Sequence, residues 1–194
     1  MSGTVRYVDE PAQRLTRSEF HAWADAQPHG KFERHSGVVI ALAPERSNHV
    51  RLKATAWRLL REGIIAGRLP CEAFSDGMTV EIGVDDDFVP DAIVRCGFSF
   101  LGNVTVVPDP LIVVEVLSPS TSVTDRTEKL AAYFRLPSIQ HYLIVWSDRI
   151  RVVHHRRDDD TVATATYTTG AIALDPPGLS LDVAELYAEV GDLG

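Results

Sequence analysis

The sequence predicts an α/β or α+β protein in which helices cover a mixed β-sheet. Three observations lead to this class. Apolar residues recur at helical spacing in three separate segments, short apolar or alternating runs are typical of strands, and the two kinds of segment are interleaved along the chain. At 194 residues the chain fits a single domain, residues 1–194, with a sizeable core.

The first half of the chain combines two helices with a hairpin. Thr16 and Glu19 have the spacing of a capping box, which predicts a helix over 17–26. The segment KFERHSGVVIALA has a Ser-Gly pair at its middle and is typical of a hairpin between two short strands. A second helix is predicted over 47–62, with Ser47 as its cap.

The second half is richer in strands. MTVEIGV and AIVR are predicted as strands, and LIVVEVL is apolar on both faces, as a central strand should be. Asp125 and Glu128 have capping-box spacing and predict a third helix that ends before Pro137. HYLIVW, RIRVVHH and TVATATYTT then follow as strands, and DVAELYAEV as a closing helix. We expect the acidic runs 85–87 and 158–160 to form solvated turns.

Composition and charge exclude several classes of protein. Hydrophobic residues make up 45% and charged residues 24%, which is typical of a globular domain. No apolar run approaches the roughly 20 residues needed to cross a membrane. The net charge of −8 argues against a protein that coats nucleic acid through a wide basic surface, although it leaves room for a local basic site.

The expected location is the cytoplasm. The first residues, MSGTVRYVDEPAQR, lack the apolar core of an export signal. In a reducing compartment, two cysteines without CxxC spacing are usually unpaired and buried, and we expect this of Cys71 and Cys96.

One glutamate stands in the middle of the predicted central strand. Glu115 is flanked by apolar residues, and burying an unpaired carboxylate costs roughly several kcal/mol, so it needs a lysine, an arginine or a metal ion as partner. Asp91 begins another apolar strand, and Lys129 lies on the helix that follows Glu115. If the two strands are neighbours, the two acids and a backbone carbonyl form a site for a hard cation.

These residues resemble those of a known nuclease superfamily. Pro90-Asp91, Glu115 and Lys129 are similar to the acidic pair and lysine of the PD-(D/E)XK nucleases, although the lysine usually stands two residues after the second acid, where this chain has Leu117. The order EVLSPST, DRTEKLAAYF and SIQHYLIVW resembles a branch with the lysine on the following helix, the Uma-two family, whose members are classed as endonucleases. FERHSGVVIALAP and GLSLDVAELY resemble its opening hairpin and closing segment, so the resemblance covers most of the chain.

The resemblance implies a fold, an activity and a set of site residues. The fold would be a restriction-endonuclease-like mixed β-sheet flanked by helices, and the activity a metal-dependent hydrolysis of phosphodiester bonds in DNA. Asp91, Glu115 and the carbonyl of Val116 would hold Mg²⁺, with Mn²⁺ as a possible substitute. Lys129 would orient the attacking water or stabilise charge at phosphorus, and Glu33 matches an early catalytic acid that would complete the metal shell.

Further residues are candidates for substrate binding. His49 and Lys53 lie on a locally basic helix, and Tyr133 shares a helix face with the predicted lysine. Two positions depart from the family pattern, because His141 and Trp146 stand where the family often has acids. A homodimer is expected, because cutting both strands of a duplex usually takes two sites.

Other interpretations stay open at this point. Glu115 and Lys129 could form a buried ion pair without chemistry, and the chain could be a catalytically inactive nuclease-fold module that binds nucleic acid or a protein partner. The serine run SPSTS lacks the GxSxG spacing of a nucleophile, and glycine-rich phosphate loops are absent from the sequence. His154 and His155 are adjacent on a predicted strand, so they point to opposite faces and are poorly placed to share a metal.

Overall fold

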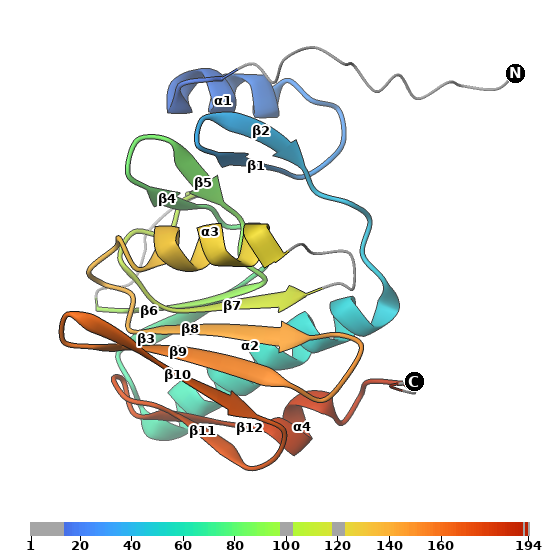
Figure 1. Ribbon diagram of the computed structural model, residues 1–194, viewed down its shortest axis with the longest axis vertical. Coiled ribbons are helices and arrows are strands. Elements are labelled where there is room, and N and C mark those ends of the chain that lie inside the picture. Colours follow the sequence, from blue (N-terminus) through green and yellow to red (C-terminus); the bar gives the residue numbers. More distant parts are fainter. Residues whose placement is uncertain (1–13, 98–102, 118–122, 192, 194) are drawn as a thin grey trace, which may run out of the picture.

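A six-stranded mixed sheet organises the molecule. The structure, a computed structural model, describes residues 14–97, 103–117, 123–191 and 193. The strand order is β10-β9-β8-β7-β6-β3; β7 and β8 run parallel, and the other neighbouring pairs are antiparallel (Figure 1). The strands are β3 (Cys71–Ser75), β6 (Ala92–Cys96), β7 (Pro110–Leu117), β8 (His141–Trp146), β9 (Val152–Asp158) and β10 (Thr161–Tyr167).

Two smaller sheets accompany the large one. A four-stranded sheet has the order β2-β1-β5-β4, and a hairpin pairs β11 with β12. These strands are β1 (Phe32–His35), β2 (Val38–Ala41), β4 (Val80–Ile82), β5 (Asp86–Phe88), β11 (Ala171–Leu174) and β12 (Leu179–Asp182).

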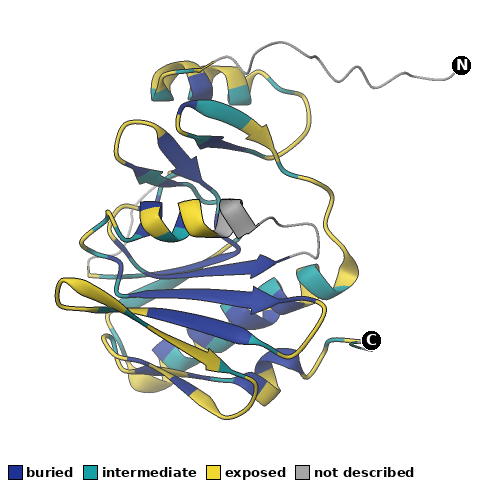
Figure 2. Cartoon of the chain, in the orientation of Figure 1, coloured by how far each residue is buried: buried dark blue, intermediate teal, exposed yellow. Residues whose placement is uncertain are grey.

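The large sheet separates two apolar cores. On one face, α2 (Ser47–Gly67), the β11–β12 hairpin and α4 (Val183–Tyr187) pack against alternate residues of the sheet. On the other face lie α3 (Val123–Tyr133) and residues of β4 and β5, while α1 (Arg17–Asp25) lies beside β1 and β2 (Figure 1). Strands β7 and β8 are buried along almost their whole length (Figure 2), as expected for the apolar run LIVVEVL.

Most predicted elements are confirmed, with differences at the ends of α2. Thr16 and Glu19 form the capping box that starts α1. Helix α2 is longer than predicted, because it continues through Gly63 to Gly67. A Cβ at Gly63 would come within 2.9 Å of Leu179, so the glycine lets α2 approach β12 closely. The prediction of Ser47 as the cap is wrong: Arg46 holds the cap position, and no side chain caps the helix there.

Two residues of the first acidic run are buried, against the prediction of a solvated turn, whereas Asp85 lies in an exposed turn as predicted. Asp86 and Asp87 are 6% and 0% exposed on β5, because distant arginines and a backbone amide bind them. Arg34 and Arg17 each donate to one oxygen of Asp87 over 2.6 Å. The second acidic run, 158–160, is an exposed turn as predicted.

Loss of Arg34 is expected to destabilise the protein strongly. Its fully buried guanidinium also donates to the carbonyls of Leu15 and Val84, so Arg34→Met removes these bonds and one of the two arginine partners of Asp87. We expect a loss of about 3 kcal/mol in the free energy of unfolding, measured by urea titration. Arg58→Met, which breaks an exposed i,i+4 pair, should cost less than about 1 kcal/mol, and an equal loss in both variants would contradict this account.

The prediction of unpaired cysteines is wrong. Cys71 and Cys96 are direct partners in the antiparallel register of β3 and β6, and they form a disulfide. Pairing of the two strands thus brings together residues separated by 25 positions, which spacing alone did not indicate.

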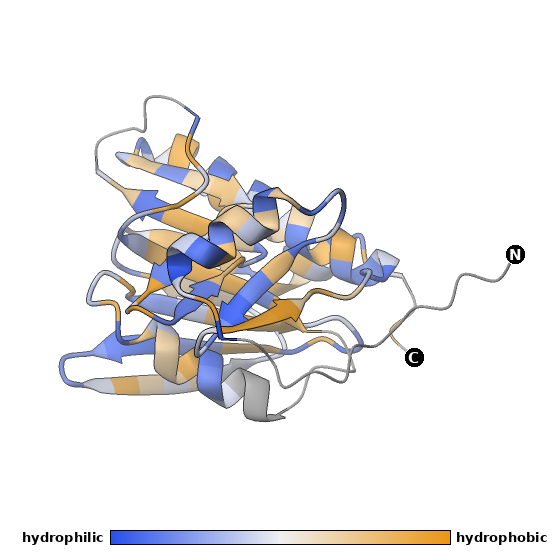
Figure 3. Ribbon diagram, turned by 90° about the horizontal axis from the view of Figure 1, so that it is seen from above, coloured by the Kyte–Doolittle hydropathy of each residue, from blue (hydrophilic) through white to orange (hydrophobic). Residues whose placement is uncertain are grey.

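Some sequence predictions fall on parts that the structure does not describe. The chain start 1–13, the serine run 118–122 and the side chain of Asp125 lie outside the described residues. Among the described residues, no helix is long and apolar enough to cross a membrane. Hydrophilic and hydrophobic residues are interspersed along the strands and helices (Figure 3).

Candidate active site

Two carboxylates meet where β6 and β7 lie side by side. Ala92 is opposite Val114 in the antiparallel register, which brings Asp91 and Glu115 next to each other at the end of β6. The backbone N–H of Asp91 donates to the carbonyl of Val114 over 3.1 Å. Both acids are largely buried, with 7% and 8% of their surface exposed. The predicted convergence of the two strands is therefore confirmed.

Backbone geometry adds a third oxygen to this pair. The N–H of Val116 donates to Oδ2 of Asp91 over 2.7 Å, so Val116 turns its backbone groups to the β6 side of β7. In a strand the carbonyl of a residue points to the same side as its N–H. Pro90, the residue before Asp91, has no N–H to donate to that carbonyl. Two carboxylates and a carbonyl form an all-oxygen donor set that fits a hard divalent cation.

Helix α3 brings two donors onto Glu115. The helix follows β7 and precedes β8 in the chain, and it packs on one face of the sheet. Its inner side carries Lys129 and Tyr133, one turn apart. The Tyr133 hydroxyl donates to Oε1 of Glu115 over 2.7 Å, and the Lys129 ammonium donates to the same oxygen over 3.1 Å. One oxygen of the buried carboxylate is therefore held by two donors from one helix.

Glu33 enters the cluster from the four-stranded sheet. Its Oε1 accepts from Lys129 over 3.0 Å and from the backbone N–H of Val89 over 2.9 Å. Its Oε2 lies 2.9 Å from Nε2 of His35. Lys129 therefore bridges two carboxylates that come from different sheets, and Glu33 has hydrogen-bonding partners on both oxygens.

The pKa values of the two glutamates in the cluster are shifted in opposite directions. Burial raises the pKa of Glu115 to about 7, and the carboxylates of Glu33 and Asp91 add to the effect against the opposing Lys129 ammonium. Burial alone would also raise the pKa of Glu33, but Lys129 and His35 outweigh it, and that pKa is lowered. Burial first, and then Glu115, raise the pKa of Tyr133, so its hydroxyl stays a donor at neutral pH. A cation beside Glu115 would offset the cost of its negative charge.

The predicted substrate-binding residues lie at different distances from the acids. His49, in the first turn of α2, has Nε2 3.3 Å from Oδ1 of Asp91. Lys53, one turn further on, is paired with Asp76 over 2.8 Å and with Glu45. His49 is thus part of the cluster, whereas the ammonium of Lys53 is shared between two other carboxylates.

The structure adds residues that the sequence analysis missed. Glu45 lies four residues before His49, with Oε1 3.9 Å from Nε2 of the imidazole. His35 lies two residues after Glu33, and that spacing places both on one face of a strand, so the pair had a recognisable signal. Val89 contributes only its backbone N–H, which donates to Glu33, so its residue type did not indicate this role in the sequence.

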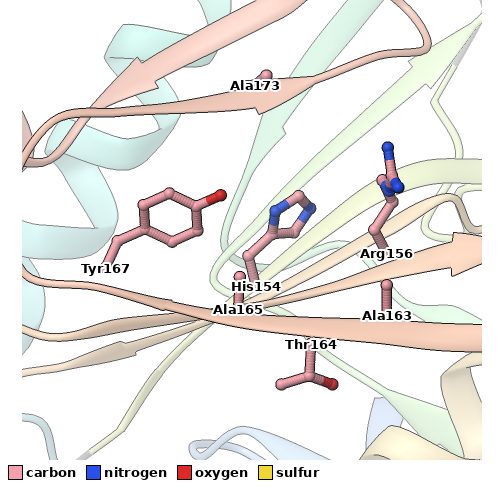
Figure 4. Close-up of a pocket in the computed structure, with 7 residues that line it drawn as sticks. All are labelled: His154, Arg156, Ala163, Thr164, Ala165, Tyr167 and Ala173. Carbon is pink, nitrogen blue, oxygen red and sulfur yellow. The ribbon is translucent and has the colours of Figure 1, made fainter.

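A pocket of about 300 Å³ lies on the other face of the sheet. His154, Arg156 and Tyr167 line it together with small residues (Figure 4). His154 is opposite Leu143, which packs in the α2 core, whereas Glu115 is opposite Ile144 in the α3 core. The pocket is therefore separate from the acid cluster, and none of the predicted site residues lines it.

The two residues that depart from the family pattern lie on opposite faces of the sheet, His141 on the α2 face and Trp146 on the α3 face, where it is opposite Leu117. The Nε2 atom of His141 donates to the carbonyl of Pro176 over 2.9 Å, so in the neutral pair its Nδ1 accepts from Nε2 of His154 over 2.9 Å. This histidine pair lies on the α2 face. The Trp146 ring packs under the guanidinium of Arg151.

Histidine burial predicts a pH dependence of stability. Burial, followed by the neighbouring His141, lowers the pKa of His154 to about 4. Between pH 6.5 and 4 the His154 imidazole binds a proton in the unfolded chain but not in the folded protein. The free energy of unfolding therefore falls as the pH falls. Over this interval the free energy of unfolding, measured by urea titration, should fall by roughly 2 kcal/mol less in His154→Gln than in the wild type. The exposed His29→Gln variant is the control, and identical pH profiles for His154→Gln and the wild type would contradict the prediction.

A family match extends over most of the chain. Uma2, a family with the description "Putative restriction endonuclease", matches residues 17–184, which contain the whole acid cluster. The chain belongs to the Uma2 family. This confirms the resemblance found in the sequence, and it supports a nuclease as the coarse assignment of function.

Two relatives and a solved structure are similar to most of this chain. The uncharacterized protein slr1290 of Synechocystis sp. is 28% identical over 91% of this chain and 93% of its own length. A second uncharacterized protein of that organism, sll1609, is 31% identical over 75% of this chain and 82% of its own length. The crystal structure of a putative nuclease belonging to DUF820 from Anabaena variabilis has a TM-score of 0.71 at 18% identity, covering 90% of this chain and 98% of that one. The restriction-endonuclease-like fold is thereby confirmed.

Proposed function

We propose that this Uma2 protein is a metal-dependent endonuclease that hydrolyses phosphodiester bonds of DNA within a single domain. The observation that carries the proposal is the linked placement of Asp91, Glu115 and Lys129. Two buried carboxylates lie side by side at the end of β6, and the ammonium donates to one of them. A structural ion pair needs one carboxylate for one ammonium, whereas this cluster gathers an excess of acid, as metal-dependent phosphodiester hydrolysis requires.

Asp91, Glu115 and the carbonyl of Val116 are assigned to hold Mg²⁺, with Mn²⁺ as a substitute that accepts the same oxygen ligands. When bound, the cation supplies charge neutralisation at the phosphate and lowers the pKa of a nearby water. The Val116 amide fixes one oxygen of Asp91, and Tyr133 fixes one oxygen of Glu115. These contacts orient both carboxylates before the cation arrives.

Lys129 is assigned to hold positive charge beside the reacting phosphate and to orient the attacking water. Its ammonium lies against two carboxylates and 5.3 Å from the centre of the Phe88 ring, so its position is restrained from several sides. Glu33 is a positioning residue for Lys129 in this scheme, because both of its oxygens already have protein partners. This differs from the sequence-based idea that Glu33 completes the metal shell.

We further propose that the protein acts as a homodimer in the cytoplasm, where its DNA substrate lies. Two sites related by a twofold axis would reach both strands of a duplex. Light scattering after gel filtration tests the dimer, and a monomer at micromolar concentration contradicts it. Cell fractionation tests the location, and recovery of the protein outside the cytoplasmic fraction contradicts it.

A cleavage assay tests the proposed activity. Supercoiled plasmid and single-stranded DNA are incubated with the protein and Mg²⁺ or Mn²⁺, with EDTA as the metal-free control. We expect nicked or shortened products in the presence of metal and none with EDTA or with Asp91→Asn. Glu62→Gln, an exposed substitution on α2, should leave cleavage unchanged. A wild-type protein that binds DNA and leaves it intact with both metals would favour the inactive nuclease-fold module.

A further inference from the structure

We propose that the pocket lined by His154, Arg156 and Tyr167 binds a small organic acid that carries a hydroxyl group. The carboxylate of this ligand pairs with the Arg156 guanidinium, and its hydroxyl donates to Nδ1 of His154. The inference goes beyond the proposed function, because the pocket lies on the α2 face of the sheet and none of the acids assigned to the metal lines it.

The hollow arises because small residues stand opposite large ones. In the antiparallel register of β9 and β10, Ala165 is opposite His154 and Ala163 is opposite Arg156. Side chains that are opposite each other share one face of a sheet, so the two alanines leave space beside the imidazole and the guanidinium. Ala173 of β11 lines the same pocket, whose volume is about 300 Å³. This volume lies at the lower end of the range for ligand pockets, which favours a small ligand.

The imidazole of His154 offers a hydrogen-bond acceptor to the pocket. Only 5% of this residue is exposed, and its Nε2 donates to Nδ1 of His141 over 2.9 Å, because Nε2 of His141 already donates to a carbonyl. The neutral His154 ring therefore has its lone pair on Nδ1. Within the part of the chain that the structure describes, this atom has no hydrogen-bond partner. A buried acceptor without a partner is costly, and a ligand hydroxyl would satisfy it.

Tyr167 adds a second polar group on the same side of the pocket. Its hydroxyl points toward the His154 imidazole from the neighbouring strand (Figure 4), and the centres of the two rings are 6.4 Å apart. A phenol hydroxyl both donates and accepts hydrogen bonds. Tyr167 can therefore donate to the ligand hydroxyl that itself donates to His154.

Arg156 supplies the positive charge. Its Nη2 is 3.9 Å from Oδ1 of Asp158, and both side chains are at least half exposed, so this long ion pair is weak. A guanidinium binds a carboxylate through two parallel N–H donors. Arg156 follows His154 by two residues on β9, which places the two residues about 7 Å apart on one face of the strand. A single small hydroxy acid spans that separation.

Calorimetry on the full chain at pH 7 compares matched probes. The hydroxy acids 4-hydroxybenzoate and 3-hydroxybutyrate are paired with benzoate and butyrate, which lack the hydroxyl. We expect at least one hydroxy acid to bind about tenfold more tightly than its partner, because only the hydroxy acid donates to His154. Equal affinities within both pairs would contradict the proposed contact.

Three variants locate the binding. Arg156→Gln should weaken the binding of the hydroxy acid about tenfold or more, because it removes the charge that pairs with the carboxylate. Ala165→Leu keeps that charge but fills the space opposite His154, so it should abolish binding, and folding should persist because Ala165 is exposed. Arg149→Gln, at another exposed arginine beside an aspartate, should bind as the wild type does.

Nuclear magnetic resonance of protein with ¹⁵N-labelled histidine supplies a direct readout. The Nδ1 signal of His154, assigned with His154→Gln, should shift when the hydroxy acid is added, because that nitrogen gains a hydrogen bond. An unchanged Nδ1 signal in the presence of bound ligand would overturn the proposal. So would binding that survives Ala165→Leu, or the failure of both hydroxy acids to bind at millimolar concentration. None of these measurements depends on DNA cleavage.

Discussion

Replacing Glu115 by glutamine should abolish metal-dependent DNA cleavage, with a loss of at least about a hundredfold. The side chain is the buried carboxylate of the assigned Mg²⁺ site, and an amide oxygen is a much weaker ligand for a hard cation. Cleavage rates on plasmid, measured across a titration of Mg²⁺, check the prediction. Excess metal should restore little of the cleavage rate, because the glutamine amide also lacks the negative charge that attracts the cation.

Loss of folding would not explain this result. Because burial raises the pKa of Glu115 to about 7 from an unfolded value near 4.5, its ionisation opposes folding as the pH rises through this interval. The metal-free Glu115→Gln variant should therefore be about as stable as the wild type at pH 8, even though the bond from Lys129 is weakened. Urea titration is the control. Full cleavage by a folded Glu115→Gln variant would remove Glu115 from the site.

Replacing Lys129 by methionine should separate metal binding from catalysis. We expect Lys129→Met to bind Mg²⁺ about as well as the wild type, because the ammonium competes with the cation for Glu115. Cleavage should fall by about a hundredfold or more, since the charge beside the phosphate is gone. Calorimetry with Mg²⁺ and plasmid nicking on the same preparation measure the two quantities.

The same variant should also reveal the cost of the buried acids. Without the ammonium, Glu33 and Glu115 lose their shared partner, and the metal-free protein should lose about 3 kcal/mol of stability at pH 8. The loss should be smaller at pH 5, where Glu115 is protonated. Lys31→Met, at an exposed pair with Asp76, provides the comparison. Metal binding abolished as completely as in Glu115→Gln would contradict the separate roles assigned to the two residues.

The sequence predicted that Asp91, Glu115 and Lys129 lie together because they stand on two consecutive strands and on the helix that follows. Asp91 and Glu115 belong to neighbouring antiparallel strands, and Lys129 lies on the crossover helix that must return over the same face. An apolar strand with one carboxylate already required a partner. Local pattern and connectivity were therefore sufficient to bring these three together.

The contacts that the sequence did not predict depend on the packing of distant segments. Asp87 is buried because Arg34, from a strand 53 residues earlier in the chain, reaches it across the small sheet. Lys129 meets Glu33 over 96 positions for a similar reason. The Cys71–Cys96 bond depends on the register of two strands, which composition does not encode. In each case the missing information is which elements lie side by side.

Anomalous X-ray scattering from a crystal soaked in Mn²⁺ tests the central claim most directly. The account predicts a peak within about 2.5 Å of carboxylate oxygens from both Asp91 and Glu115 and of the Val116 carbonyl. A Glu115→Gln crystal treated in the same way should lose that peak. A wild-type map without a peak at Asp91 and Glu115, and with Lys129 still bound to Glu115 at millimolar Mn²⁺, would show that the cluster is a buried ion pair and not a metal centre.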